Sequence, residues 1–205
     1  MKKIEKIGVL GGAFNPPHLG HLKIAETAKK ILKLDEIIFI PSGIPPLKKE
    51  GLAKPEDRFK MVSLLIEGKK DFKVLDYEIK KKKRSFTIET ISYLKRKFKK
   101  CKIFWIIGED SFREIIQEKW KGGLKVLDLA KFVVFTRPGH QFCLKKLPKK
   151  FEKNKEIALK KVILIKKNIP ISATKIREKI KKGESVKKFL PKKVLDYIKE
   201  RGLYV

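Results

Sequence analysis

The sequence predicts an α/β protein with a doubly wound, Rossmann-like parallel sheet of about five to six strands flanked by helices. The first observation is that short apolar runs alternate along the 205 residues with segments of helical periodicity. The second is that glycine, proline and polar residues follow several of these runs, as at the ligand-binding edge of a parallel sheet. Hydrophobic residues make up 42% of the chain, which suffices for a buried core.

The apolar runs bounded by turn residues are the expected strands, at 4–10, 35–41, 72–79, 102–108, 131–139 and 160–167. Helices are expected at 19–33, 55–67 and 85–98, from Glu109 onward, and over ISATKIREKIKKG and PKKVLDYIKERG. The lysine-rich segment 144–156 shows no clear periodicity, and we expect it to be irregular. We treat 1–205 as one domain, with a Rossmann-like core over 1–167 and a small C-terminal helical region over 168–205.

No apolar stretch approaches the roughly 20 residues that a membrane-spanning helix needs, and the N-terminal apolar run is too short for a signal peptide. We therefore expect a cytoplasmic protein with no membrane partner. Cys101 and Cys143 lack the CxxC spacing of a metal or redox site, so both are expected to be ordinary reduced cysteines.

The charge balance is strongly basic, since 53 Lys and Arg residues against 23 Asp and Glu residues give a net charge of +30. Such a charge attracts polyanions, and a basic nucleic-acid-binding module is one alternative function. The excess is mainly lysine spread along the chain, with only seven arginines. Specific nucleic-acid sites favour arginine forks, so we favour a solvated lysine-rich surface and expect no specific nucleic-acid partner.

The segment LGGAFNPPHLGHLK combines a glycine turn at Gly11 and Gly12 with His18 and His21 at the start of a helix. A helix N-terminus and imidazole N–H groups can both bind phosphate. A metal site needs three or four ligands, and no Cys or carboxylate lies at ligand spacing here. Simple packing of the histidines is the other alternative, but phosphate binding explains more of the pattern.

A second polar cluster lies near the other end of the chain, in IPISATKIRE. Ser172 is the expected N-cap of a helix, with its hydroxyl serving the free amides, and Thr174 lies in the first turn. Arg177 follows one turn later and could bind phosphate with its planar guanidinium. A capped amphipathic helix without a ligand is the alternative for this segment alone.

Taken together, GGAFNPPHLGH resembles the GxFxPxHxGH signature of the nucleotidyltransferase superfamily, and ISATKIR resembles its C-terminal ISxTxxR signature. Between them, IPSGIPPLK, SFTIETI, IIGEDSF, a tryptophan and FTRPG are similar to segments of bacterial nicotinate-nucleotide adenylyltransferases. The resemblance covers 4–204. The chain departs from that pattern at Ala173, at Leu47 before Lys48, and at Lys121, where the family usually has serine, histidine and an aromatic residue.

The resemblance implies transfer of AMP from ATP to nicotinate mononucleotide, giving deamido-NAD and pyrophosphate. Mg²⁺ is the implied cofactor, held mainly by the ATP phosphates with no metal ligand on the protein. The implied catalytic residues are His18, His21 and Arg177, with His21 the first choice for the transition state. The implied ATP-binding residues also include Gly11, Gly12, Ala13, Phe14, Gly108, Asp110, Ile171, Ser172 and Thr174.

On the acceptor side, the resemblance implies that Lys48 steers the phosphate, that the Thr87 backbone N–H receives the pyridine carboxylate, and that Trp120 stacks on the ring. Asp110, for the ribose hydroxyls, and Arg137 complete the implied substrate-binding set. The run Lys80–Lys83 is either a solvated turn, which we favour, or a source of positive potential that favours nicotinate over the neutral amide. Nicotinamide mononucleotide and phosphopantetheine are alternative acceptors, and a homo-oligomer is left open.

Overall fold

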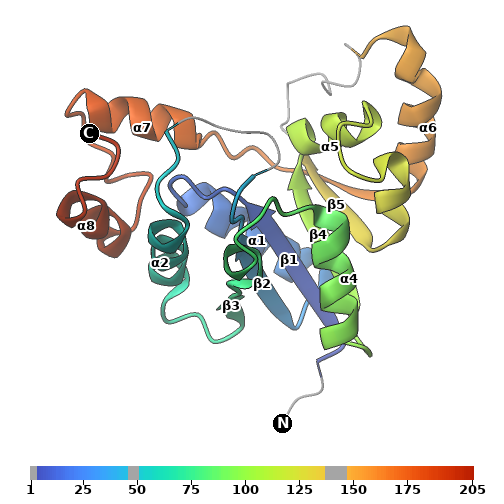
Figure 1. Ribbon diagram of the computed structural model, residues 1–205, viewed down its shortest axis with the longest axis horizontal. Coiled ribbons are helices and arrows are strands. Elements are labelled where there is room, and N and C mark those ends of the chain that lie inside the picture. The colour runs from blue at the N-terminus through green and yellow to red at the C-terminus, as the bar shows by residue number, and fades with distance from the viewer. Residues whose placement is uncertain (1–3, 46–50, 137–146) are drawn as a thin grey trace.

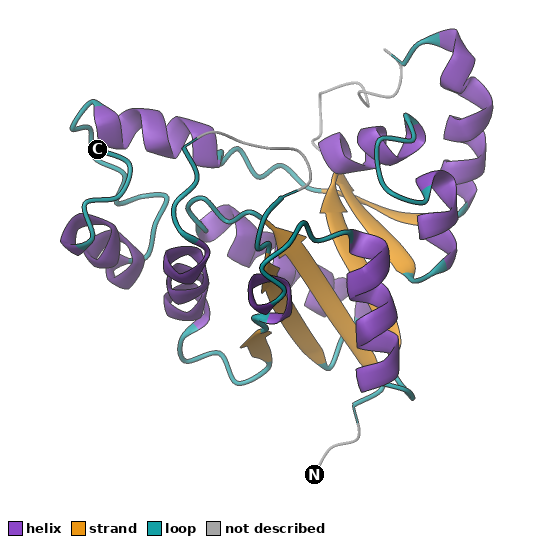
Figure 2. Ribbon diagram, in the orientation of Figure 1, coloured by secondary structure: helices purple, strands orange, loops and turns teal. Residues whose placement is uncertain are grey.

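The structure, a computed structural model, describes residues 4–45, 51–136 and 147–205. A parallel β-sheet lies between two layers of helices, as Figures 1 and 2 show. The α/β fold class predicted from the sequence is therefore confirmed.

The sheet has the strand order β3-β2-β1-β4-β5-β6, and every pair of neighbours is parallel. The order reverses between β1 and β4, so the carboxyl ends of these two strands flank the switch point of the sheet. The strands are β1 (Lys6–Gly12), β2 (Glu36–Pro41), β3 (Phe72–Val74), β4 (Lys102–Gly108), β5 (Lys131–Thr136) and β6 (Val162–Lys166).

Strand side chains alternate between the two faces and build two separate cores. Leu10 and Ile106 pack with α1, α2, α7 and α8, whereas Val9 and Trp105 pack with α4, α5 and α6. The helices are α1 (Leu19–Leu32), α2 (Pro55–Ile66), α3 (Tyr77–Lys80), α4 (Thr87–Lys97), α5 (Glu109–Ile116), α6 (Glu152–Lys160), α7 (Ala173–Lys181) and α8 (Lys192–Glu200), with 3₁₀ turns η1 (Gly123–Asp128) and η3 (Lys149–Phe151). None of the helices in the described ranges combines the length and apolar character that crossing a bilayer requires.

The expected strand over 72–79 is wrong in its second half. The strand ends at Val74, and the chain then forms the short helix α3. Tyr77 stacks on Tyr93 of α4 with ring centroids 3.8 Å apart, and Glu78 is buried. Contacts with α4 therefore stabilise a helical turn where the local pattern of apolar residues suggested a continued strand.

The expectation of an irregular segment over 144–156 is also wrong for its described part. Residues 149–160 form η3 and α6, although the many lysines hide the amphipathic pattern. Ala158 is fully buried, and the Asn154 side chain donates to the Ile116 carbonyl at 3.1 Å, so the helix is fixed on α5. Residues 144–146, Cys143 and the end of the predicted strand over 131–139 lie outside the described residues.

The C-terminal segment 168–205 packs beside α1 and α2 at one end of the sheet, with α7 and α8 on the left in Figure 1. The Leu19 backbone N–H donates to the Phe189 carbonyl at 2.9 Å. Asp57 of α2, only 5% exposed, accepts hydrogen bonds from the Tyr197 hydroxyl at 2.8 Å and the Arg201 Nε at 3.3 Å. One buried carboxylate thus connects α2 to the last turn of α8.

Replacing Asp57 should loosen this connection. We expect Asp57→Ala to lower the free energy of unfolding by about 2–4 kcal/mol, because a half-buried hydroxyl and a guanidinium lose their buried, charged acceptor. Urea unfolding measures the change. Asp196→Ala, at an exposed carboxylate of α8, is the matched control and should change the free energy by less than about 0.5 kcal/mol. Equal effects of the two substitutions would contradict the assigned role of Asp57.

Candidate active site

The candidate site lies at the carboxyl edge of the sheet, around the switch point. Gly12 at the end of β1 pairs with Pro41 at the end of β2, and Gly108 of β4 pairs with Phe135 of β5. Within the described residues, the motifs that follow β1 and β4 and the first residues after β2 therefore lie at one edge, as their order in the chain predicted.

The glycine turn has a packing reason as well as a predicted functional one. A Cβ atom on Gly11 would lie 3.0 Å from the Trp105 ring, so a larger residue would press on the core beneath the sheet edge. Phe14 has a positive φ of 49° and is only 3% exposed, and its ring meets His21 edge-on at 5.0 Å. The close approach of a nucleotide to Gly11 stays a prediction.

His18 and His21 lie together at the N-terminus of α1. Their rings are stacked with centroids 3.7 Å apart and planes 21° apart. The His18 backbone N–H donates to His21 Nδ1 at 3.1 Å, so a neutral His21 carries its proton on Nε2. A Cβ atom on Gly20 would lie 2.9 Å from the His18 ring, so glycine at this position makes room for the imidazole.

Both imidazoles are held in the neutral form. Burial lowers the pKa of His18 to about 4. Burial also lowers the pKa of His21 well below its ordinary value, and the neighbouring His18 adds to the effect. His18 Nδ1 is buried and has no hydrogen-bond partner within the described part of the chain. The pair is therefore suited to donate neutral N–H groups to an anion, at a helix N-terminus without acidic residues in its first turn.

Asn15 connects this loop to three distant segments. Its Oδ1 accepts from the Ala53 backbone N–H at 2.9 Å and from the Tyr204 hydroxyl at 2.7 Å, and its Nδ2 donates to the Gly51 carbonyl at 3.0 Å. Its backbone carbonyl accepts from Arg177 Nη1 at 2.8 Å. The Asn15–Pro16 peptide bond is cis.

The contact with Asn15 brings Arg177 of α7 beside the histidine loop, as the two sequence motifs predicted. Arg177 Nη2 also lies 3.5 Å from the exposed Thr174 hydroxyl. Ser172 occupies the N-cap position, but the expectation that its hydroxyl serves the amides is wrong, because its side chain makes no capping bond. Ile171 packs against the core beside this turn. The amides of the first turn of α7 are thus not covered by the Ser172 hydroxyl.

Arg58 of α2 holds the loops under the site together. Its guanidinium is 1% exposed and donates to the carbonyls of Ala13 at 2.8 Å, Gly43 at 2.9 Å and Ala53 at 3.0 Å. These carbonyls belong to the turn after β1, the loop after β2 and the segment before α2. Three hydrogen bonds to carbonyls offset the cost of burying the charge.

The predicted acceptor-binding residues lie at the start of α4 and after α5. Thr87 is the first residue of α4 and is half-buried. Trp120 donates from Nε1 to Glu114 Oε2 at 3.0 Å and packs against the core of that face. The neighbouring Lys121 places Nζ 4.6 Å from the centre of the Phe86 ring and 3.2 Å from Glu89 Oε1. Lys121 thus brings the Trp120 segment to the first turn of α4.

For the remaining predicted site residues, the structure shows fewer contacts or none. Gly108 and Asp110 are exposed at the end of β4 and the start of α5, on the predicted edge of the sheet. No contact of Asp110 with the histidine loop is seen in the described ranges, so its role stays a prediction. Lys48 and Arg137 lie outside the described residues. Within the part of the chain that the structure describes, no group of three or more His, Cys, Asp or Glu side chains could hold a metal ion.

Asn15, Arg58 and Tyr204 were not predicted from the sequence. Asn15 lies inside the first motif, between Phe14 and Pro16, but a motif does not show which side chain joins distant segments. Arg58 carried a usable signal, since it is one of only seven arginines in a lysine-rich chain. Tyr204 carried no comparable signal.

Comparison with known proteins agrees with this arrangement. The family model described as Cytidylyltransferase-like matches residues 9–179. A probable nicotinate-nucleotide adenylyltransferase of Clostridium tetani is 41% identical over 210 residues, covering 98% of this chain and 100% of that protein. A relative with the same name from Caldicellulosiruptor saccharolyticus is 37% identical over 199 residues, covering 97% and 98%.

Solved structures share the fold. Nicotinic acid mononucleotide adenylyltransferase of Plasmodium falciparum, complexed with NaAD, superimposes with a TM-score of 0.76 at 22% identity, covering 98% of this chain and 97% of that one. The same enzyme complexed with APC gives a TM-score of 0.75 at 20% identity, covering 98% and 97%. At this level of identity the likeness shows the fold.

The neutral histidines predict how stability depends on pH. In the unfolded chain both imidazoles take up protons near pH 6.5, whereas folded His18 does so only near pH 4. Above pH 6.5 both states are neutral and no protonation free energy is lost on folding, whereas stability is lost as the pH falls from 6.5 towards 4. His18 alone should account for about 3 kcal/mol of this loss.

Urea unfolding at pH 7.5 and pH 4.5 tests this expectation. The double variant His18→Asn, His21→Asn should lose less free energy of unfolding over that interval than the wild type. Comparing the two proteins cancels other titrating groups, including Glu78, whose burial raises its carboxyl pKa and acts in the opposite direction. Identical losses in the two proteins would show that the histidines are not buried in the neutral form.

Proposed function

Since the chain belongs to the nicotinate-nucleotide adenylyltransferases, within the Cytidylyltransferase-like family, we propose that it transfers AMP from ATP to nicotinate mononucleotide. The products are deamido-NAD and pyrophosphate, a step of NAD biosynthesis. The observation that carries the proposal is the stacked His18–His21 pair at the N-terminus of α1, joined through Asn15 to Arg177 of α7. This contact between the two sequence motifs supports a shared phosphate site.

The reaction needs positioning and charge stabilisation more than proton transfer. The phosphate of the acceptor is already a competent nucleophile at neutral pH, so no covalent intermediate and no side-chain base are required. The protein has to bring two anions into line and to stabilise charge on the α-phosphate and on the departing pyrophosphate. Neutral imidazole donors serve this purpose, because they bind phosphate oxygens without a protonation step at pH 7.

We assign His21 Nε2–H to the α-phosphate in the transition state and His18 to the same triphosphate. Arg177 and the free amides of the first turn of α7, beside Ser172 and Thr174, would hold the β- and γ-phosphates. The turn at Gly11, Gly12, Ala13 and Phe14, with Ile171, Gly108 and Asp110, would hold the rest of ATP. The division of labour between His18 and His21 is settled by the variants described below.

A divalent metal, with Mg²⁺ our assignment, fits this donor set as a companion of ATP. The side chains assigned to the phosphates, His18, His21 and Arg177, are neutral or cationic, and no group of three or more His, Cys, Asp or Glu side chains in the described residues could hold the ion. The phosphates would therefore carry Mg²⁺ into the site, where it neutralises charge on the triphosphate.

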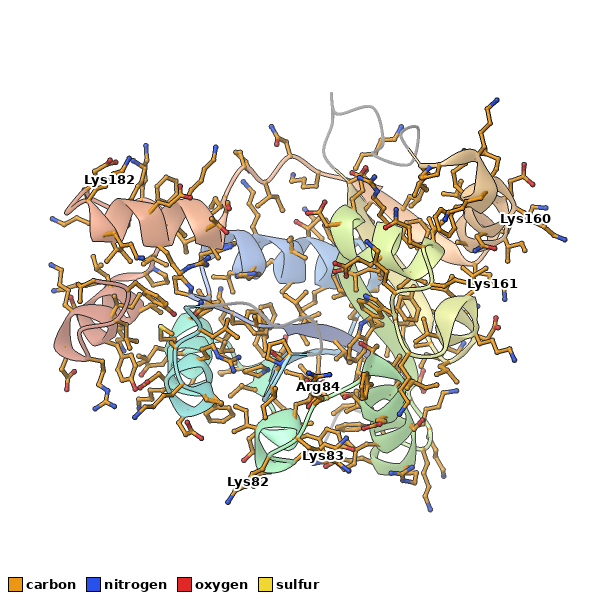
Figure 3. All side chains as sticks on the ribbon, turned by 45° about the horizontal axis from the view of Figure 1, so that its top comes forward. Lys82, Lys83, Arg84, Lys160, Lys161 and Lys182 are labelled. Atoms are coloured by element: carbon orange, nitrogen blue, oxygen red, sulfur yellow. The ribbon has the colours of Figure 1, made fainter. Side chains whose placement is uncertain are left out.

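For the acceptor, we assign the Thr87 backbone N–H to the pyridine carboxylate and Trp120 to the ring, with Lys48, Asp110 and Arg137 as further contacts. Of the lysine run, Lys81 lies closest to the first turn of α4, at 2.5 Å from Glu89 Oε2. Lys80 pairs with Asp76 at 2.8 Å, while Lys82 and Lys83 are exposed, at the lower edge of Figure 3. This arrangement supports a solvated turn for most of the run.

We propose that the chain binds small molecules and no specific nucleic acid. We also propose that it acts in the cytoplasm and forms a single nucleotidyltransferase domain. Basic side chains lie on separate parts of the surface: Lys82 and Lys83 near α3, Lys160 and Lys161 at the end of α6, and Lys182 after α7 (Figure 3). This distribution argues against one continuous strip for nucleic acid.

Pyrophosphate release tests the proposed function. With ATP and Mg²⁺, we expect turnover with nicotinate mononucleotide and a kcat/KM at least about tenfold lower with nicotinamide mononucleotide, because the amide lacks the charge that the α4 amides receive. Phosphopantetheine should give no release above background. Faster turnover with either alternative acceptor would contradict the assignment, and a gel shift with nucleic acid at physiological salt would favour the basic binding module.

Replacing His21 tests the role of the imidazole pair. We expect His21→Ala to lower kcat by about 10²–10³-fold, the scale on which a single transition-state donor acts. His18→Ala should raise the KM for ATP more than it lowers kcat, if His18 serves mainly in binding. Circular dichroism and urea unfolding check that each variant folds, and near-normal turnover of folded His21→Ala would refute the assignment.

A further inference from the structure

Glu78 is a buried carboxylate that the proposed mechanism does not use. It lies in the middle of α3 and is only 7% exposed. The Thr90 hydroxyl, itself fully buried, donates to Glu78 Oε1 at 2.7 Å. Burial raises the pKa of the Glu78 carboxyl, whereas the hydrogen bond from Thr90 and the charge of Lys81 oppose this rise. A buried carboxylate is costly, so its place in the structure needs a reason.

The backbone of Glu78 touches the loop after β2. A Cβ atom on Gly43 would lie 2.3 Å from the Glu78 carbonyl oxygen, so only glycine allows this approach. The same Gly43 presents its own carbonyl to the buried Arg58 at 2.9 Å. The loop that leads to Lys48 therefore lies between Arg58 on one side and α3 on the other.

The segment before α4 is held against the same loop. The Ser85 backbone N–H donates to the Ile44 carbonyl at 3.3 Å, and Ile44 forms a parallel bridge with Arg84. The Ser85 hydroxyl reaches the Glu78 carbonyl at 3.4 Å. The segment 84–90 is thus held by the loop after β2 and by α3. Glu78 contacts this segment near both of its ends, at Ser85 and at Thr90.

Thr90 lies three residues after Thr87, one turn along α4. Its backbone N–H bonds the Phe86 carbonyl at 3.2 Å and so closes the first turn of the helix. Fixing Thr90 by a charged acceptor fixes the rotation of this turn about the helix axis. The directions of its free N–H groups, Thr87 among them, are then fixed as well.

We propose that Glu78, acting through Thr90, is a positioning residue that orients the first turn of α4 to receive the carboxylate of the acceptor. The inference rests on the proposed function, because it assumes that the acceptor's carboxylate binds at this turn. The proposed function assigns the ATP phosphates to the histidine loop and α7, neither of which bonds the Glu78–Thr90 pair, so we expect ATP binding not to depend on this contact.

Steady-state kinetics of Thr90→Val and Glu78→Leu test the proposal with ATP and nicotinate mononucleotide varied separately. Both variants should raise the KM for nicotinate mononucleotide by about tenfold, the scale of one hydrogen bond to a charged group. The KM for ATP and kcat should stay within about twofold of the wild type, because an acceptor-positioning contact acts on binding alone. Thr90→Ser and Glu78→Gln keep a donor and an acceptor, and should restore the KM for nicotinate mononucleotide.

Ser92→Ala is the matched control, since Ser92 lies on the same helix and its hydroxyl bonds the Ile88 carbonyl at 2.8 Å, within the helix. It should leave both KM values unchanged. If Glu78→Leu does not fold, the nearly isosteric Thr90→Val still decides the question. An unchanged KM for nicotinate mononucleotide in Thr90→Val, or equal rises in both KM values, would overturn the inference while the active wild type upholds the proposed function. A wild type that does not use nicotinate mononucleotide would overturn both.

Discussion

The buried guanidinium of Arg58 is the constraint on which the candidate site depends. It binds one carbonyl from each of three segments: Ala13 after β1, Gly43 after β2, and Ala53 before α2. Loops at a sheet edge have few partners of their own, and a single planar cation with donors pointing outward can serve all three. The candidate site lies on these loops, so the three hydrogen bonds of Arg58 help to fix the positions of its segments. The buried charge of Arg58 thus serves to position the three loop segments more than to stabilise the fold.

Much of the fold followed from local pattern. The strands of the sheet's centre are runs of apolar residues ended by glycine or proline, and β1, β2 and β4 lie within two residues of their predicted bounds. Prediction was wrong where local pattern and tertiary contact disagree. Around Tyr77, stacking on Tyr93 favours a helical turn over a continued strand, and over 149–160 lysines conceal a helix anchored by Asn154 and Ala158.

The site was predictable where its residues share a motif. His18, His21 and Arg177 lie in two short signatures, and the structure brings them to one loop. The residues that hold this loop are different in kind, because Asn15 meets Ala53 and Tyr204 across separations of 38 and 189 residues. A hydrogen bond between residues so far apart cannot be predicted from motif spacing or from hydrophobic periodicity. Glu78 was hidden for the same reason, since its environment is made by segments from three parts of the chain.

The contacts of Asn15 also bear on when the site forms during synthesis. The histidine motif ends at residue 23 of 205, yet Arg177 and Tyr204 bond Asn15 from 162 and 189 positions later. The loop of the proposed nucleotide site is therefore completed only after Arg177 and Tyr204 have been synthesised, much later than its signature. The central strands β1, β2 and β4 are all synthesised before Arg177, so they can pair before this loop is complete.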